Sequence, residues 1–151
     1  MNWLVYFHVL SVVIWIGGVA FVTAIVLPVL TRMEDSMAKV SFFVAFEKRF
    51  QFLAKIFVIL AGASGILMFW NRGAFASLTG EEAALLGYKF LVWLTFAILL
   101  FGGEKRLMGA LVSQKMTPEK AFRRLSLFHW FVLILSLMAI VAGIRLVRGV
   151  S

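Results

Sequence analysis

Four long runs of apolar residues, each almost free of charge, are the feature that most limits how this chain can fold. A hydrocarbon core of about 30 Å needs roughly 20 apolar residues at ~1.5 Å of helical rise each. Runs of this length cover residues 3–30, 52–70, 84–103 and 125–147. The chain, residues 1–151, is therefore expected to be a single all-α domain, an integral membrane four-helix bundle.

Composition agrees with this fold class. Hydrophobic residues make up 63% of the chain, charged residues 15%, and the mean hydropathy is +1.01. A soluble domain of this size could not bury so much apolar surface. The chain has no cysteine, which excludes disulfides, iron–sulfur clusters, covalent c-type haem and thiolate metal sites. Any cofactor must therefore be held by nitrogen, oxygen or thioether ligands.

Local signals predict where the helices begin. Thr79 and Glu82 have the spacing of a capping box, so the third helix should begin before it enters the bilayer. Thr117 followed by Pro118 is typical of a cap and a first helical position, and the fourth helix should begin there. Both helices are thus expected to be longer than their apolar runs.

The end of the first helix and the cytoplasmic segments carry further signals. Pro28 cannot donate a hydrogen bond to the carbonyl of Ala24, which predicts that the helix ends or bends near the membrane interface. Residues 36–50 and 104–115 are predicted to be helical extensions at or beyond the cytoplasmic surface. No linker is long enough to separate two domains.

The distribution of Lys and Arg predicts the orientation. Cytoplasmic loops carry an excess of these residues, so both termini should face outward across a bacterial-type inner membrane. The net charge of +8 then reflects contact with the anionic lipid bilayer, and nucleic acid is not an expected partner. The predicted inner residues are Arg32, Lys39, Lys48, Arg49, Lys105, Arg106, Lys115, Lys120, Arg123 and Arg124, and the outer ones are Arg72, Arg145 and Arg148.

A weak internal repeat relates the two halves of the chain. Residues 48–50 before the second helix resemble residues 123–125 before the fourth, and residues 6–8 parallel residues 87–89. This pattern predicts two repeated helical hairpins related by a pseudo-twofold axis along the membrane normal.

Ionisable groups inside a bilayer are costly unless they face a partner, so they are the first candidates for function. His8, Ser11, Trp15 and Gly18 share one face of the first helix. An imidazole with a glycine further along the same face is how a helix accommodates a flat macrocycle. We therefore interpret this face as a candidate cofactor surface.

The depth of each group can be estimated from the helical rise. His8 and Lys89 should both lie about 8 to 9 Å from the outer surface, and His129 about 8 Å from the cytoplasmic one. The two histidines of one chain should then differ in depth by about 13 Å, which disfavours a shared iron. Either histidine could instead hydrogen-bond a neighbouring helix, and Lys55 is expected to reach the cytoplasmic interface.

Three segments support a family resemblance. Residues 6–18 (YFHVLSVVIWIGG) resemble the first helix of the copper-resistance D-type membrane proteins and the related membrane protoporphyrinogen oxidases. Residues 87–91 (GYKFL) resemble their lysine-bearing helix, with tyrosine at a position where those families often have another residue. Residues 47–50 (EKRF) resemble the basic start of their second helix. The resemblance implies a four-helix unit that binds haem b or a porphyrin, with His8 as a ligand and Lys89 as the intramembrane lysine.

The first functional hypothesis is therefore a haem b-binding membrane protein that acts in electron transfer or haem handling. His8 and His129 are the candidate axial ligands of the metal, and a second ligand from another protomer would make the protein a homo-oligomer. A quinone or another redox partner would exchange electrons with the haem. The candidate pocket residues are Ser11, Trp15, Gly18 and Lys89, and the candidate partners of the haem propionates are Arg49, Arg124, Arg72, Arg145 and Arg148.

Other functions stay open at this point. The chain could be an enzyme that oxidises protoporphyrinogen, with Lys89 holding a substrate carboxylate or moving a proton. It could also be a copper-transport-like protein, although its seven methionines are scattered, or a purely structural membrane subunit. Whether the chain is an enzyme does not follow from these patterns.

Overall fold

The computed structural model describes residues 3–71, 79–112 and 117–148. These residues are helical throughout except at short connections. The first long helix is built from α1 (Trp3–Phe21), a π-helical segment η1 (Val22–Val26) and α2 (Leu27–Arg32). The other three are α3 (Ser36–Asn71), α4 (Gly80–Val112) and α5 (Pro118–Arg148).

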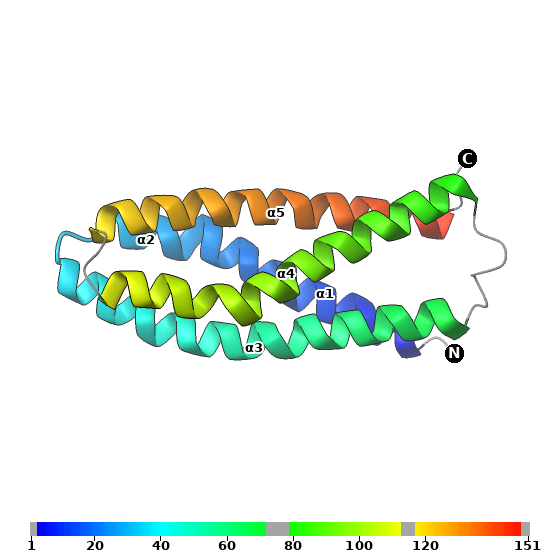
Figure 1. Cartoon of the computed structure of the whole chain (residues 1–151), viewed down its shortest axis with the longest axis horizontal. Coiled ribbons are helices and arrows are strands. Elements are labelled where there is room, and N and C mark those ends of the chain that lie inside the picture. The colour runs from blue at the N-terminus through cyan, green and yellow to red at the C-terminus, as the bar shows by residue number, and fades with distance from the viewer. Residues whose placement is uncertain (1–2, 72–78, 113–116, 149–151) are drawn as a thin grey trace.

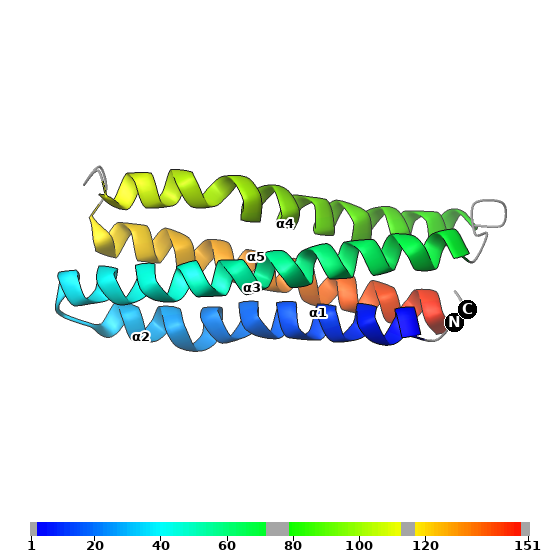
Figure 2. The ribbon, with the colours of Figure 1, turned by 90° about the horizontal axis from the view of Figure 1, so that it is seen from below.

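The long helices form an elongated bundle (Figures 1 and 2). Both chain termini lie at one end of it, and the turn between α2 and α3 lies at the other. The first helix packs most closely along α3 and α4 along α5, and α4 runs obliquely across the bundle (Figure 1). This arrangement joins neighbours in sequence as antiparallel hairpins; the predicted pseudo-twofold relation between the hairpins stays a prediction.

The all-α part of the predicted fold class is confirmed. Within the described residues, four helices are long and apolar enough to cross a membrane: Trp3–Arg32, Ser36–Asn71, Gly80–Gly102 and Glu119–Val147. The outer faces of these helices are apolar, with residues such as Leu10, Val13 and Leu91 more than half exposed. Such a surface suits lipid contact, because a soluble protein rarely exposes so much contiguous apolar area.

The helix boundaries follow the sequence signals closely. Glu82 N donates to Thr79 Oγ1 at 3.3 Å and Thr79 N donates to Glu82 Oε2 at 2.8 Å, which confirms the capping box. α5 begins at Pro118, as predicted. The predicted extension over residues 36–50 is part of α3, and that over residues 104–115 is confirmed as far as the end of α4, since residues 113–115 lie outside the described part of the chain.

Pro28 does not end the first helix. The chain continues helically to Arg32, because the π-helical turn η1 lies directly before the proline and takes up the break in the hydrogen-bond pattern that Pro28 causes. α2 then ends at Arg32, and the next residue, Met33, has an extended backbone.

Two apolar clusters hold the bundle together. One lies near the α2–α3 turn and joins Leu27, Leu30 and Phe43 to Phe122, whose ring meets Phe43 edge to face at 5.1 Å. The other lies at mid-bundle and includes Trp15, Val58, Val92, Phe96 and Val132. These clusters fix the helix faces that carry the polar groups described next.

Candidate functional site

His8 is held by α3. Its Nδ1 lies 2.9 Å from the carbonyl oxygen of Ala61 and 3.2 Å from Ser64 Oγ, whose own hydroxyl donates to carbonyls of α3. A carbonyl can only accept, so Nδ1 carries the proton and Nε2 keeps its lone pair. Histidines that ligate metals typically have this arrangement, with one ring nitrogen anchored and the other available.

Two glycines leave space for the side chains of His8 and Lys89. A Cβ on Gly65 would lie 3.2 Å from His8 Cε1, and a Cβ on Gly143 would lie 3.1 Å from Lys89 Nζ. The small pair Ala61 and Gly65, interpreted from sequence as a helix-packing motif, therefore packs against α1 through the imidazole itself.

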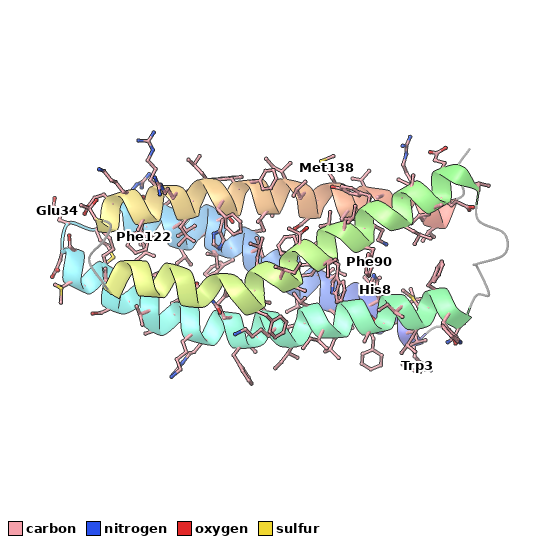
Figure 3. The ribbon with its side chains drawn as sticks, viewed as in Figure 1. Trp3, His8, Glu34, Phe90, Phe122 and Met138 are labelled. Carbon is pink, nitrogen blue, oxygen red and sulfur yellow. The ribbon has the colours of Figure 1, made fainter. Side chains whose placement is uncertain are left out.

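Lys89 reaches the same place from α4 and interacts electrostatically with His8. The two side chains therefore lie at a similar level of the bundle, and their depth in a membrane stays a prediction. Within the described part of the chain, no carboxylate forms an ion pair with Lys89, although the ammonium is partly buried. A buried ammonium is stable only with a compensating partner, so this position favours binding of an anionic group. We call His8, Ser64, Gly65, Lys89 and Gly143 the His8–Lys89 site; Figure 3 shows His8 in the half of the bundle that holds the termini.

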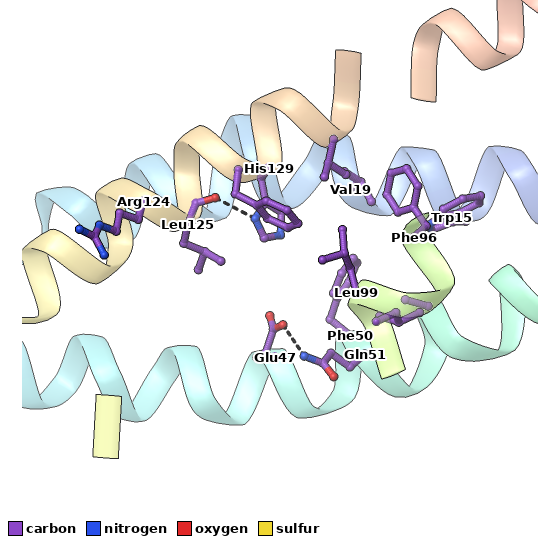
Figure 4. Close-up of a pocket in the computed structure, with 14 residues that line it drawn as sticks. Trp15, Val19, Glu47, Phe50, Gln51, Phe96, Leu99, Arg124, Leu125 and His129 are labelled. Carbon is purple, nitrogen blue, oxygen red and sulfur yellow. Dashed lines mark hydrogen bonds between the residues drawn. The ribbon is translucent and has the colours of Figure 1, made fainter. Parts of the chain in front are cut away.

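His129 lies on a separate cavity of about 320 Å³ (Figure 4). Its Nδ1 lies 2.9 Å from the carbonyl oxygen of Leu125, one turn earlier on α5, so its Nε2 also keeps a lone pair. The walls are mostly aromatic and aliphatic. The lining residues are Trp15, Val19, Glu47, Phe50, Gln51, Ala54, Phe96, Leu99, Leu100, Arg124, Leu125, Phe128, His129 and Val132, which we call the His129 cavity.

Two polar residues of α3 face this cavity. Glu47 points from α3 toward α5, while His129 points from α5 toward α3 (Figure 4). Gln51 Nε2 donates to Glu47 Oε1 at 2.8 Å, and both side chains are buried, with 7% of Gln51 exposed. Among the described residues, Gln51 Oε1 has no hydrogen-bond partner.

The two histidines do not share a site. The residues of α3 that they face, Ala61 for His8 and Gln51 for His129, are ten residues apart, or about 15 Å along the helix. His8 is not among the residues that line the His129 cavity. This separation agrees with the depth difference predicted from the sequence.

The face of α1 that was interpreted as a cofactor surface is directed into the bundle. It contributes residues to both the His8–Lys89 site and the His129 cavity. Ser11 is buried and donates to the carbonyl of Phe7 at 2.7 Å. Trp15 lines the His129 cavity and meets Phe96 edge to face at 4.6 Å. Gly18 lies under Phe50, whose ring would be 3.0 Å from a Cβ there. The aromatic ring for which Gly18 leaves space is therefore that of Phe50.

The arginines that were predicted to pair with the haem propionates lie in different parts of the structure. Arg124 lines the edge of the His129 cavity, whereas Arg49 is exposed and is not among the lining residues. Arg145 is exposed near the end of α5. Arg72 and the side chain of Arg148 lie outside what the structure describes. Lys55 Nζ lies 5.8 Å from the centre of the Phe101 ring, a cation–π contact inside the predicted span.

Several residues of these sites were not predicted. The i, i+4 spacing of Glu47 and Gln51 places them on one face of α3, and this spacing was the available signal. Ser64 and Gly143 gave no such signal, because small residues are common in membrane helices and their partners come from other helices.

No group of three or more His, Cys, Asp or Glu side chains able to hold a metal ion occurs among the described residues. A bare metal ion is therefore not supported there. A haem differs, since the macrocycle supplies four nitrogens and the protein need supply only axial ligands. Comparison of the chain with protein-family models, curated proteins and solved structures gave no match.

Proposed function

We propose that this protein binds haem b in the membrane, with His8 Nε2 as an axial ligand, and acts in electron transfer or haem handling. The observation that carries the proposal is the pairing of an anchored imidazole with a partly buried lysine from another helix. Both groups lie inside predicted membrane spans, where each is costly without a partner.

The chemistry of these side chains fits haem b. The imidazole is a ligand for iron, and the Lys89 ammonium can pair with a propionate, which needs a cation in a low-dielectric setting. When bound, the haem would supply one-electron chemistry at its iron. The chain's own contribution is to hold the His8 ring through Ala61 and Ser64, exclude water and place a cation beside the ligand.

His129 is the alternative ligand. It lies about 15 Å from His8 along the bundle axis, so it would serve a different iron. A second imidazole for the iron at His8 would then come from another copy of the chain, which favours a homo-oligomer. We place the protein in a bacterial-type inner membrane with both termini outside, on the basis of the Lys and Arg distribution.

A second candidate function is oxidation of protoporphyrinogen. The observation that favours it is Lys89, whose ammonium has no carboxylate partner in the described residues and could hold a substrate carboxylate.

The absorption spectrum of detergent-purified protein tests these functions. Haem b binding predicts a Soret band, with sharp α and β bands after reduction. Turnover of protoporphyrinogen without stoichiometric haem would favour the second function. A colourless protein that also fails to take up added haemin would contradict the proposal.

A further inference from the structure

His129 presents a hydrogen-bond acceptor to its cavity. Its Nδ1 donates to the carbonyl of Leu125 at 2.9 Å, so Nε2 keeps a lone pair. The ring points from α5 into the space between α5 and α3 (Figure 4). An acceptor without a donor in an apolar space raises the free energy of the protein, and an occupant with an N–H or O–H group would remove this cost.

The polar residues of the opposite wall do not offer a second acceptor to an occupant. Gln51 Nε2 donates to Glu47 Oε1 at 2.8 Å, and the other side-chain oxygen of each residue is enclosed by protein atoms. Arg124 lies at the edge of the cavity and is exposed (Figure 4). Within the described lining, the acceptor that an occupant meets is therefore the His129 imidazole. A ligand of this cavity needs one donor and no charge.

The walls and the volume define the body of the ligand. Trp15, Phe50, Phe96 and Phe128 supply aromatic surface, which favours a flat ring that packs edge to face or offset against it. An apolar cavity of about 150 Å³ binds one benzene ring, so the volume of about 320 Å³ at His129 is enough for two fused rings. A lipid acyl chain would fill the same space but leave His129 Nε2 without a donor.

We propose that the His129 cavity binds a neutral, flat aromatic molecule of up to two fused rings that carries one N–H or O–H donor, as in an indole or a phenol. Its ring packs among the aromatic side chains, and its donor bonds to His129 Nε2. This inference goes beyond haem binding and does not depend on it, because His8 is not among the residues that line the cavity.

Equilibrium dialysis of indole and indene against the full-length protein in detergent tests the proposal, with partition into protein-free micelles subtracted. The two probes have the same fused-ring shape, but only indole has a donor. We expect indole to bind about tenfold more tightly than indene. His129→Phe keeps a ring without the acceptor, and it should weaken indole binding about tenfold and change indene binding by less than about twofold. Thr95→Val is the matched control, because Thr95 is exposed on α4 and donates to the carbonyl of Leu91 at 2.8 Å.

Leu99→Trp tests whether the probes bind in the cavity. Leu99 points into this space from α4 (Figure 4), so a larger side chain there should fill it and weaken binding of both probes by about tenfold or more. Unchanged indole binding in this variant would place the probe elsewhere and overturn the proposal. The comparison of indole with indene in the unmodified protein requires no variant, so it decides the matter even where a variant does not fold.

Equal affinity for indole and indene, or an equal loss of both in His129→Phe, would overturn the proposal, because the cavity would then not recognise a donor. Binding of neither probe would also overturn it and leave the cavity to lipid. Haem content is measured on the same samples, so that the two proposals can fail separately. A colourless protein that prefers indole would contradict haem binding alone, whereas loss of haem in His129→Phe would assign the cavity to haem and overturn the present proposal.

Discussion

The His8–Lys89 site and the His129 cavity each anchor a histidine through Nδ1, but they surround the free Nε2 differently. At the first site the neighbouring polar group is a cation, Lys89, reaching over from another helix. In the cavity the polar residues on the opposite wall are Glu47 and Gln51, which are hydrogen-bonded to each other. The same imidazole tautomer therefore stands near a cation in one place and in a mostly apolar cavity in the other.

This difference shows that burial of a histidine does not by itself define its role. The charge and the donor or acceptor character of the facing wall decide which partner is stable there. Variants that affect one site and leave the other intact therefore test the role of each histidine separately.

The largest effect on folding is expected at Gly62, between the two sites. A Cβ there would overlap the indole of Trp93, whose Nε1 donates to the carbonyl of Val58 at 2.8 Å. Gly62→Ala should lower the free energy of unfolding in detergent by about 2 to 3 kcal/mol through overpacking and disturb both sites together. Gly87→Ala is the control, because open space surrounds Gly87, and it should change stability by less than about 1 kcal/mol. Equal stability of the two variants would contradict the observed α3–α4 contact.

Lys89→Met should separate the sites. Loss of the ammonium removes a charge-assisted partner for a propionate, worth about 1.5 to 3 kcal/mol, so haem affinity should fall at least tenfold. Haemin titration of the purified variant measures this change, and Lys55→Met serves as a control, because the Lys55 ammonium lies near the Phe101 ring and is not part of the His8–Lys89 site. Unchanged haem affinity in Lys89→Met would remove the lysine from the cofactor site.

Ser64→Ala should have the smallest effect. His8 Nδ1 would lose the acceptor at 3.2 Å but keep the carbonyl of Ala61 at 2.9 Å, so the ring stays anchored. A weakening of haem binding by about 0.5 to 1 kcal/mol is expected. Ser136→Ala removes an equally buried hydroxyl that donates only within α5 and should leave haem binding unchanged. A complete loss of haem in Ser64→Ala would mean that the serine, and not Ala61, positions the imidazole.

Much of the fold could be predicted from the sequence because membrane helices depend mainly on local composition. Run length gave the four spans, the Thr79–Glu82 spacing gave the start of α4, and Pro118 gave the start of α5. At Pro28 the sequence left open whether the helix ends or bends; the π-helical turn that lets it continue to Arg32 could not be predicted, because such a turn has no distinct sequence signal.

The candidate sites were predicted only in part. Counting residues along each helix placed His8 and Lys89 at one depth and His129 at another, and in the structure His8 and Lys89 lie near each other while His129 lines a separate cavity. The His129 cavity, and the position of the Glu47–Gln51 pair in its wall, depend on which faces of α3 and α5 oppose each other. That relation is set by packing between helices distant in sequence, so periodicity within one helix does not reveal it.

The haem content of His8→Ala and His129→Ala, purified side by side and measured from their reduced absorption spectra, tests the central assignment most directly. If His8 is the axial ligand, the first variant should lose the α band and nearly all haem, while the second retains the haem of the unmodified protein. Full haem content in His8→Ala, together with loss in His129→Ala, would contradict the account and move the haem to the His129 cavity.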